Sequence, residues 1–373
     1  MNRTLVVTND FPPRQGGIQT FVAALLDRRP PDSLVVLASD HPGSAEHDAG
    51  LPYPVVRRPT GMLLPTPATA RVAVDLVRRY GCDNAFFGAA APLGLLAPAL
   101  REAGVGHLVG ATHGHETGWV AVPGGRTLMR RIATNLDVVT YISEYTRRRL
   151  APALGERTRL ERLSPGVDVD AFTPDADGAA IRARHGLGGA PLVVCVSRLV
   201  ARKGQDVLVA AWPQVLARQA DARLLLVGGG PLEPALRTEI AARGLERSIV
   251  LTGPVPPAEL PVHYAAGDVF AMPCRTRRLG LDVEGLGMVF LEAAACGRPV
   301  VAGTSGGAPE AVLDGETGTV VDPRSPQAVA DAVSALLDDP ARARAMGAAG
   351  RAWVEQRWSW TTIAARFAEL LEG

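Results

Sequence analysis

The sequence is almost without lysine. Of its 39 Lys and Arg residues, only Lys203 is lysine. A composition rich in alanine and arginine is typical of a GC-rich genome, in which arginine replaces lysine over time. The one lysine that remains indicates a position where a compact ammonium serves better than a planar guanidinium. Chance survival of a single lysine is the alternative interpretation.

Cysteine is also scarce, and so are long hydrophobic runs. The four cysteines, Cys82, Cys195, Cys274 and Cys296, are scattered without a C-x-x-C motif. This spacing argues against a disulfide framework or a clustered zinc site and predicts reduced, buried thiols in a cytoplasmic protein. Residues 4–8 already read as a strand, so we expect no signal peptide. No apolar run is long enough to span a bilayer.

Neither sign of charge is in excess. The formal net charge is +1, which gives no general reason to expect nucleic acid as a partner. With 373 residues, 47% of them hydrophobic, the chain is long enough for two separate hydrophobic cores. We therefore expect a globular protein of two domains.

Short apolar strands alternate with helices in both halves of the chain. Predicted strands lie at residues 4–8, 34–38, 84–87, 107–112 and 138–142, then at 192–196, 223–227, 249–252, 269–272 and 300–302. Such alternation predicts parallel sheets with right-handed crossovers. The sequence thus predicts an α/β fold of two Rossmann-like, doubly wound domains facing each other across a cleft. Residues 52–67 read as loop, residues 165–189 as a Pro/Asp/Gly-rich link, and the tail after residue 310 as helical.

One segment combines two carboxylates with a glycine-rich turn and a helix. Glu284 precedes Gly285 and Gly287, and Glu292 lies about one turn inside a helix predicted over residues 288–296. The backbone N–H groups at residues 286–289 would be the unpaired first donors of that helix and would attract an anion. Carboxylates accept hydrogen bonds from sugar hydroxyls. The segment suits a nucleotide-sugar, although an ordinary capped helix with solvated glutamates is equally compatible.

Two cations lie on the loop between the strand at 192–196 and the following helix. Arg198 and Lys203 would suit two negative phosphates, with a surface ion pair as the alternative. Three glycines at residues 228–230 do not form a G-x-G-x-x-G motif, and we interpret them as a tight turn. Asp168-x-Asp170 resembles a metal-binding pair, but its position in the link favours turn chemistry.

Candidate residues of the first half follow two predicted strands. Gly16 and Gly17 stand between a strand and a helix, as in a phosphate cradle, although a plain turn explains them as well. His113 follows the strand at 107–112, and ligands of open α/β sheets bind at the carboxyl ends of strands. We favour His113 for the site and leave His115 open between a structural and a functional role. No third ligand accompanies the two histidines, so we expect no metal.

Together these motifs resemble glycosyltransferase family four, which has the GT-B fold. The resemblance extends along most of the chain and depends on three motifs: Glu284-x7-Glu292, Ser197-Arg198-Leu199 with Lys203-Gly204, and the turn at residues 306–310. More narrowly, residues 12–19, 112–116, 273–277 and 280–284 are similar to the actinobacterial branch that adds α-1,6 mannose from GDP-mannose to a phosphatidylinositol mannoside. One difference is Arg277-Arg278-Leu279, where a glycine-rich loop is expected next to the donor sugar.

The resemblance implies domain boundaries and residue roles. It implies an acceptor-side domain at residues 1–170, a nucleotide-sugar domain at 185–357, and a C-terminal helix at about 358–373 that packs back on the first. His113, Arg198, Lys203 and Glu284 would be catalytic. The donor would be held by Gly16, Gly17, Arg198, Lys203, Val255, Glu284, Gly285, Leu286, Gly287, Met288, Val289 and Glu292. Acceptor-binding residues are not assigned.

The same resemblance implies how these residues act. Arg198 and Lys203 would hold the diphosphate and stabilise the leaving GDP, Glu292 would bind the ribose, and Glu284 the mannose hydroxyls. The base would lie along the loop at Val255, and His113 would contact the transferred sugar. Retention of configuration without a carboxylate nucleophile implies attack from the front face. No metal and no cofactor besides the donor substrate are expected.

A lipid acceptor implies peripheral contact with the inner face of the plasma membrane. Residues 62–64, beside Arg71, Arg78 and Arg79, would form an apolar and basic surface for anionic lipid. A packed loop next to a solvated helix is the alternative. Three other functions stay open: transfer with another nucleotide-sugar or to a soluble acceptor, an epimerase or hydrolase acting on the nucleotide-sugar, and a non-catalytic nucleotide-binding module.

Overall fold

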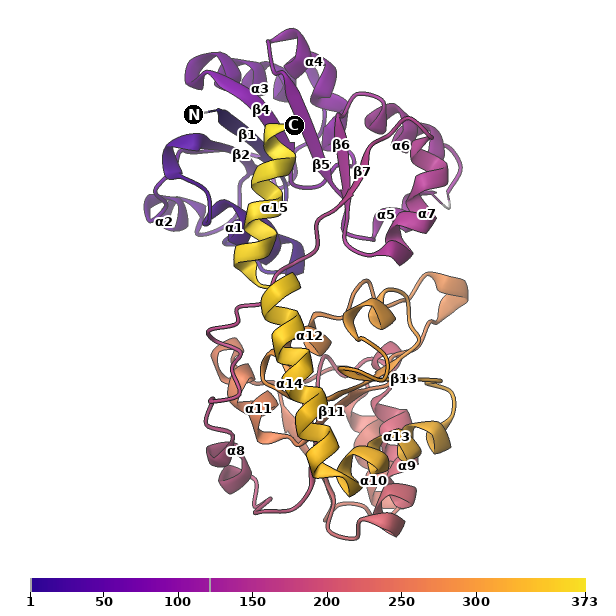
Figure 1. Cartoon of the computed structure of the whole chain (residues 1–373). Helices are drawn as coiled ribbons and strands as arrows, with labels where there is room; N and C mark the ends of the chain where they lie inside the picture. Colours follow the sequence, from indigo (N-terminus) through magenta and orange to yellow (C-terminus); the bar gives the residue numbers. More distant parts are fainter. Residues whose placement is uncertain (1, 121) are drawn as a thin grey trace. The chain divides into compact units, whose positions relative to one another are not determined.

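A computed structural model describes residues 2–120 and 122–373 and divides the chain into two α/β units (Figure 1). The first unit consists of residues 1–166 together with Trp360–Gly373, and the second of Val167–Ser359. Residues 167–184, which the sequence assigned to a link, belong to the second unit and contain a helix, α8 (Gly178–Arg184). Each unit has its own sheet and its own core.

The first unit is built on a seven-stranded sheet in the order β3-β2-β1-β4-β5-β6-β7, and every neighbouring pair is parallel. Its strands are β1 (Arg3–Thr8), β2 (Leu34–Ser39), β3 (Val55–Arg58), β4 (Cys82–Phe87), β5 (His107–Ala111), β6 (Val138–Tyr141) and β7 (Leu160–Arg162). The five predicted strands are confirmed. The prediction of loop over residues 52–67 was wrong at Val55–Arg58, where β3 lies, whereas residues 59–66 contain no helix or strand. As an edge strand, β3 is only partly buried and lacks an apolar run.

Helices cover both faces of this sheet. They are α1 (Gly17–Leu26), α2 (Ser44–Ala49), α3 (Pro67–Tyr80), α4 (Ala97–Glu102), α5 (Glu116–Val120), α6 (Gly125–Ala133), α7 (Glu144–Leu154) and α15 (Trp360–Glu372). Figure 1 shows α15, in yellow, lying against the sheet. Phe367 of α15 packs against Phe86 with ring centroids 4.8 Å apart, and the Leu370 carbonyl is 2.9 Å from His107 Nε2. The last helix is therefore part of the first unit's core.

The second unit has a six-stranded parallel sheet in the order β10-β9-β8-β11-β12-β13. Its strands are β8 (Leu192–Val196), β9 (Arg223–Val227), β10 (Ile249–Gly253), β11 (Val269–Met272), β12 (Val300–Gly303) and β13 (Gly318–Val321). β13 corrects the prediction that helices fill the tail. It is a four-residue edge strand, and two of its residues are only partly buried, so it gives little periodic signal.

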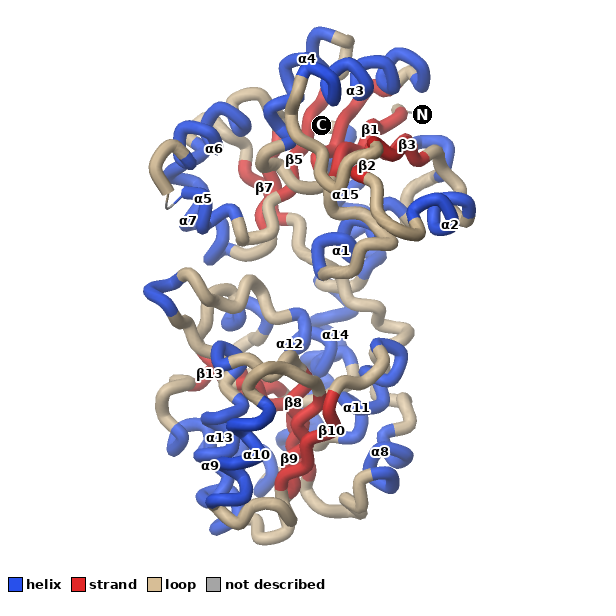
Figure 2. The backbone as a smooth tube through the Cα atoms, turned by 180° about the vertical axis from the view of Figure 1, so that it is seen from behind, coloured by secondary structure: helices blue, strands red, loops and turns tan. Residues whose placement is uncertain are grey.

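Helices also flank the second sheet (Figure 2). Besides α8 they are α9 (Gln205–Arg218), α10 (Glu233–Ala242), α11 (Leu260–Ala266), α12 (Met288–Ala295), α13 (Pro326–Asp338) and α14 (Pro340–Arg357). The turn at residues 306–310 leads only into a 3-10 turn, Ala308–Ala311, and not into the α-helix that the sequence predicted. None of the helices in the described chain combines the length and hydrophobicity needed to cross a membrane.

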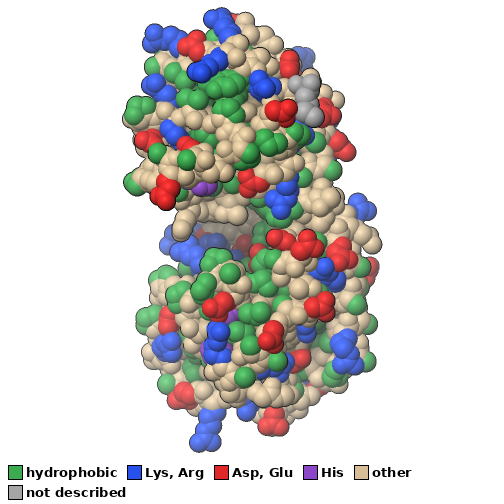
Figure 3. All heavy atoms as spheres, turned by 90° about the vertical axis from the view of Figure 1, so that its left-hand side faces the viewer, with side chains coloured by type: hydrophobic (Ala, Val, Ile, Leu, Met, Phe, Trp, Pro, Cys, Tyr) green, Lys and Arg blue, Asp and Glu red, His purple; other side chains and the backbone are tan. Residues whose placement is uncertain are grey.

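In each sheet the strand order reverses beside the first strand of the unit. In the second unit the chain runs outward from β8 through β9 and β10, then returns to β11 on the other side of β8. Doubly wound sheets bind ligands at the carboxyl edge beside such a reversal, so the loops that follow β8 and β11 are expected to border a site. The same reversal lies between β1 and β4 in the first unit. Figure 3 shows acidic and basic side chains interspersed on the visible face of each unit.

Candidate functional site

The loops after β8 and β11 meet at a glycine. Gly204 has φ +82°, and a Cβ built on it would lie 2.1 Å from the carbonyl oxygen of Pro273. A side chain there would both strain the backbone and push the two loops apart. Gly204 thereby lets Lys203, which ends the 3-10 turn Ala201–Lys203, approach the loop that carries Glu284.

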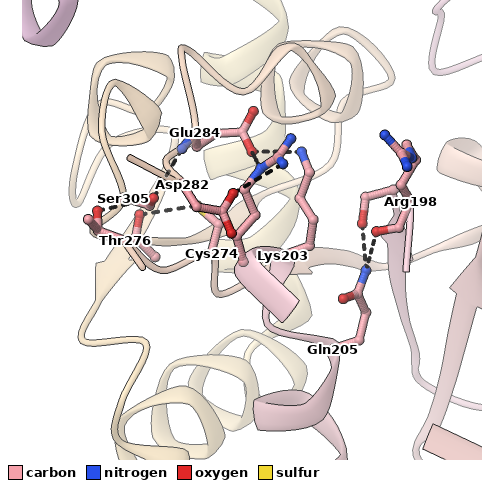
Figure 4. Close-up of polar contacts among 11 residues, drawn as sticks. Arg198, Lys203, Gln205, Cys274, Thr276, Asp282, Glu284 and Ser305 are labelled. Carbon is pink, nitrogen blue, oxygen red and sulfur yellow. Dashed lines mark hydrogen bonds and ion pairs between the residues drawn. The ribbon is translucent and has the colours of Figure 1, made fainter. Parts of the chain in front are cut away.

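A buried ion pair joins the two loops. Lys203 Nζ lies 2.7 Å from Glu284 Oε2 (Figure 4), and each residue is 8% exposed. Arg202 Nε lies 3.8 Å from the same oxygen, and Arg202 Nη1 lies 3.4 Å from Asp282 Oδ1. Two cations thus face the same buried carboxylate oxygen. Among the described residues no donor contacts Glu284 Oε1, which is left to accept a hydrogen bond from a ligand hydroxyl.

The backbone of Glu284 is held by the turn after β12. Its N–H donates to Ser305 Oγ at 3.1 Å, and its carbonyl accepts from Gly307 N at 2.9 Å. Gly306 has φ +56°, and a Cβ there would lie 2.0 Å from the Glu284 carbonyl oxygen. The glycines that the sequence analysis assigned to a turn thus fix the position of the Glu284 carboxylate.

The glycine-rich turn before α12 exposes backbone donors. Gly287 caps α12 with φ +88°, which favours glycine. Within the described residues, the N–H groups of residues 286–289 donate to no protein acceptor. Unpaired amides at a helix start form an anion-binding end. The predicted donors at Leu286, Met288 and Val289 are therefore free to bind a phosphate.

A pocket of about 570 Å³ lies beside this turn. Its lining is drawn from the three loops after β8, β9 and β10 and from two helices, and includes Ser197, Arg198, Gly228, Gly229, Gly230, Pro254, Val255, Leu260, Tyr264, Val289 and Glu292. The volume is within the range of small-molecule sites. The structure thus brings together Arg198, Val255, Val289 and Glu292, all of which the sequence analysis selected for the donor.

Arg198 and Lys203 approach the site differently. The side chain of Arg198 is exposed, and its backbone carbonyl accepts a 3.0 Å hydrogen bond from Gln205 Nε2. Figure 4 shows both cationic side chains extending in the same direction, with the Arg198 guanidinium apart from the Lys203–Glu284 pair. The Arg198 guanidinium thus has no carboxylate partner among the described residues, whereas the ammonium of Lys203 is fixed by Glu284.

Glu292 is held by a tyrosine that the sequence analysis missed. Tyr264, fully buried, donates from its hydroxyl to Glu292 Oε2 at 2.6 Å. Burial raises the pKa of Glu292, while the Tyr264 hydrogen bond and Lys203 oppose the rise. Burial and the Glu292 carboxylate hold the pKa of Tyr264 well above its usual value, so the tyrosine stays a donor. This contact orients Glu292 and leaves Oε1 for a ligand.

The raised pKa of Glu292 predicts a pH-dependent stability difference. The unfolded carboxyl titrates near 4.3, so between that pH and the folded pKa the folded chain binds more protons and stability falls as pH rises. Glu292→Gln removes the titrating carboxyl and with it this pH-dependent loss of stability. Relative to the parent, the variant should therefore gain free energy of unfolding as pH rises from about 4 to 7, measured by urea denaturation. Glu316→Gln, at an exposed residue, is the control. A difference that shrinks with pH would contradict the prediction.

His113 of the first unit lies directly after β5 in a tightly bonded turn. Its Nε2 is 2.6 Å from the Gly88 carbonyl, which can only accept, so Nε2 carries the proton. The His113 and Gly114 N–H groups donate to the fully buried Glu116 carboxylate at 3.0 and 2.9 Å. Burial lowers the pKa of His113, and Glu116 opposes this. The neutral ring therefore presents Nδ1 as an acceptor.

His115 stacks on His113 with ring centroids 6.2 Å apart and lies 3.6 Å from Glu116. The described residues contain no cluster of three or more His, Cys, Asp or Glu side chains that could hold a metal ion. The Asp168-x-Asp170 pair is a turn, because Asp168 Oδ1 accepts from the backbone of residues 170 and 171.

Gly16 and Gly17 open α1. A Cβ on Gly16 would lie 2.2 Å from Gln19 Oε1, whereas one on Gly17 would meet nothing within 4 Å. Gln19 in turn donates to Asp10 Oδ1 at 2.6 Å. Gly16, Gly17 and His113 are residues of the first unit, and the other predicted site residues belong to the second. The cleft between two facing domains stays a prediction.

Sequence reasoning missed several residues of the second unit's site. Gly228, Gly229 and Gly230 were interpreted only as a turn, yet they line the pocket, and a Cβ on Gly228 would lie 2.2 Å from the Ser197 carbonyl. Their position directly after β9 was a usable signal. Tyr264, Arg202 and Ser305 carried no motif, because their contacts join segments distant in the sequence.

Comparisons with known proteins agree with these features. Residues 15–171 match the family model for Glycosyltransferase Family 4, and residues 190–339 match the model for Glycosyl transferases group 1. A GDP-mannose-dependent α-(1-6)-phosphatidylinositol monomannoside mannosyltransferase of Mycolicibacterium smegmatis is 52% identical, covering 99% of this chain and 98% of the relative. A relative of the same name from Mycobacterium tuberculosis is 51% identical, covering 100% and 99%.

A third relative, from Corynebacterium glutamicum, is named for a monoacylated acceptor and is 47% identical, covering 99% of this chain and 98% of its own. Among solved structures, Anabaena HepE in complex with UDP superposes with TM-score 0.81 at 23% identity over the whole of both chains. Sucrose-phosphate synthase from Thermosynechococcus elongatus superposes with a TM-score of 0.76 at 24% sequence identity, covering 99% of this chain and 98% of that one. The predicted GT-B fold is confirmed.

Proposed function

Because the chain belongs to glycosyltransferase family four, we propose that it transfers α-mannose from GDP-mannose to a phosphatidylinositol mannoside, forming an α-1,6 linkage with retention of configuration. The names of the relatives that match its full length at 47–52% identity support this donor and acceptor. The observation that carries the proposal is the buried Lys203–Glu284 pair at the carboxyl edge of the second sheet. It sets a fixed cation beside a carboxylate with one free oxygen.

Positive charge at this edge would stabilise the departing nucleotide. Arg198 is exposed at the pocket, and Lys203 is fixed by Glu284 on the loop that follows β8. The N–H groups of residues 286–289 have no acceptor among the described residues. Preorganised donors aimed at developing negative charge are worth several kcal/mol in comparable sites. We propose that these groups hold the diphosphate of GDP-mannose and stabilise GDP as it leaves, without a metal ion.

The remaining donor contacts follow from the oxygens that the protein leaves free. Glu292 Oε1 would accept from the ribose, Val255 would lie along the base, and Glu284 Oε1 would accept from the mannose hydroxyls. In the first unit, His113 Nδ1 would accept from a hydroxyl of the transferred sugar, and Gly17, open above its Cα, would admit a phosphate. Attack from the front face, with a GDP phosphate oxygen taking the acceptor proton, would retain the configuration.

A lipid acceptor requires the protein to work at a membrane surface, and we propose the cytoplasmic face of the plasma membrane. The four cysteines are free and buried, which supports a reducing compartment. Met62 and Leu64 are 57% and 48% exposed, whereas Leu63 is buried. The Leu63 carbonyl accepts from Asn9 Nδ2, and its N–H donates to Asn9 Oδ1. Arg71, Arg78 and Arg79 are exposed on α3.

The proposal is tested by binding and by transfer. Calorimetric titration with GDP-mannose, UDP-glucose and UDP-N-acetylglucosamine should give the tightest binding for GDP-mannose, and radiolabel should pass to phosphatidylinositol monomannoside. If a UDP-sugar bound most tightly, GDP-mannose would be the wrong donor and that UDP-sugar would take its place in the proposal. Turnover of the donor without acceptor would favour a hydrolase or epimerase, and binding without any turnover a non-catalytic module.

A further inference from the structure

A short hairpin lies between β11 and Glu284. Arg277 N donates to the Asp282 carbonyl at 2.9 Å, and Asp282 N donates to the Arg277 carbonyl at 3.2 Å. These two bonds close an antiparallel bridge around residues 278–281. We call residues 277–281 the hairpin tip. Arg278 has φ +50°, a conformation uncommon for a residue other than glycine. The side chain of Leu279 lies outside the described part of the structure.

The base of this hairpin is tied to the donor site. Asp282 lies 3.4 Å from Arg202, which also faces Glu284. Thr276 Oγ1 lies 3.4 Å from Ser305 Oγ, the atom that accepts from the Glu284 N–H. Figure 4 shows Thr276, Asp282 and Ser305 around Glu284. The hairpin base and the carboxylate proposed to bind the donor sugar are thus one hydrogen-bonded group.

The tip, in contrast, has side chains without partners in the described protein. Leu281 is 69% exposed, more than the other exposed large hydrophobic residues of the described chain. Arg277 and Arg278 are exposed, and no described carboxylate lies within 4 Å of either guanidinium. Asp282, the nearest acidic residue in the sequence, is already engaged by Arg202. The tip therefore carries two free positive charges next to an exposed apolar side chain.

That combination fits the surface of an anionic phospholipid. Guanidinium groups bind phosphate in bidentate geometry, and an exposed leucine on the same short turn can enter the boundary between headgroups and acyl chains. An exposed leucine side chain is unfavourable in water. At a lipid surface it can bury its apolar surface while both arginines pair with phosphate groups. The phosphatidylinositol anchor of the proposed acceptor has this chemistry.

We infer that the tip of the hairpin, through Arg277, Arg278 and Leu281, binds the phosphodiester and adjoining acyl region of the lipid acceptor in its bilayer. The inference rests on the proposed function. Because the hairpin base is bonded to Glu284, a lipid bound at the tip is held on the side of the donor sugar. Arg277 and Arg278, at the position where the family resemblance led us to expect a more glycine-rich loop, thereby gain a role in acceptor binding.

The test uses the full chain and a triple variant, Arg277→Gln, Arg278→Asn and Leu281→Ser. Asn tolerates the positive φ at position 278. The matched control is Arg342→Gln with Arg344→Gln, which removes two exposed arginines of α14. Near an anionic surface each arginine strengthens binding about fivefold, so the KM for the vesicle-borne acceptor should rise about 25-fold or more. The kcat and the calorimetric Kd for GDP-mannose should stay within about twofold.

Vesicle co-sedimentation gives a readout independent of catalysis. The triple variant should lose binding to phosphatidylcholine vesicles containing phosphatidylinositol, and the control should keep it. Unchanged sedimentation and unchanged KM would overturn the inference. So would loss of sedimentation only in Arg71→Gln with Arg78→Gln, because the lipid contact would then lie on α3. A deacylated, water-soluble acceptor keeps the phosphodiester but lacks the acyl chains. An equal KM increase with this acceptor would overturn the proposed contact with the acyl region and the bilayer.

The two proposals fail in different ways. If the parent protein binds GDP-mannose but transfers no mannose to phosphatidylinositol mannoside, the proposed function fails whatever the vesicles show. If the parent transfers mannose and the triple variant does so with the parent's KM, only the role of the hairpin fails.

Discussion

Lys203→Met is expected to lower kcat for mannosyl transfer by about 100- to 1,000-fold, the loss seen when one preorganised charge-stabilising group is removed. The ammonium is buried at 2.7 Å from Glu284. Methionine keeps the length of the side chain but supplies no charge to the departing GDP. Steady-state kinetics at saturating GDP-mannose would measure the effect. A variant with the parent's kcat would show that Lys203 is only a structural partner of Glu284.

The same substitution should also destabilise the fold, and this effect can be separated from catalysis. Removing one partner of a buried ion pair costs about 3–5 kcal/mol, because Glu284 would keep only Arg202, at 3.8 Å. Adding Glu284→Gln removes the unpaired charge. The double variant should therefore recover much of the free energy of unfolding in urea but none of the activity. Recovery of both would mean that the activity loss came from unfolding.

Gly306→Ala is expected to destabilise the second unit and weaken donor binding. Its φ of +56° costs about 1–2 kcal/mol for a non-glycine residue. In addition, the new Cβ would lie 2.0 Å from the Glu284 carbonyl oxygen, so the backbone of Glu284 must move. We expect a total loss of about 3 kcal/mol or more, as for other strained or overpacked sites, and a weaker calorimetric Kd for GDP-mannose.

Gly315→Ala is the matched control. Gly315 has φ +81°, but a Cβ there would meet no atom within 4 Å. It should therefore lose only the conformational cost of about 1–2 kcal/mol and keep the parent's affinity for the donor. Equal losses of stability and unchanged donor affinity in the two variants would show that the contact with Glu284 does not position the site.

The edge strands mark the limit of what the sequence pattern revealed about the fold. Central strands such as β8 and β11 are buried along their whole length, so their apolar runs stand out in the sequence. β3, β7 and β13 are short and partly exposed. They become strands because a central neighbour offers them hydrogen-bonding partners, and no local pattern records this.

The candidate site divides in a similar way. Glu284, Glu292, Arg198 and Lys203 could be selected because they follow predicted strands or a glycine-rich turn within one local motif. The contact between Lys203 and Glu284 could not be predicted from the sequence, where Lys203 was assigned to the phosphate and Glu284 to the sugar. Their 81-residue separation is closed only when β8 and β11 pair and Gly204 admits the Pro273 carbonyl.

The sequence by itself determined the α/β class, the two parallel sheets, and the residue types that can bind a sugar diphosphate, because strand burial and glycine-rich turns are local properties. Only the tertiary structure decided which oxygens and amides are already occupied. In the structure, Lys203 pairs with Glu284, and Tyr264 donates a hydrogen bond to Glu292. Glu284 Oε1, Glu292 Oε1 and His113 Nδ1 have no partners among the described residues. Hydrogen bonds between distant segments set these assignments, and they exist only after the loops have met at the carboxyl edge of each sheet.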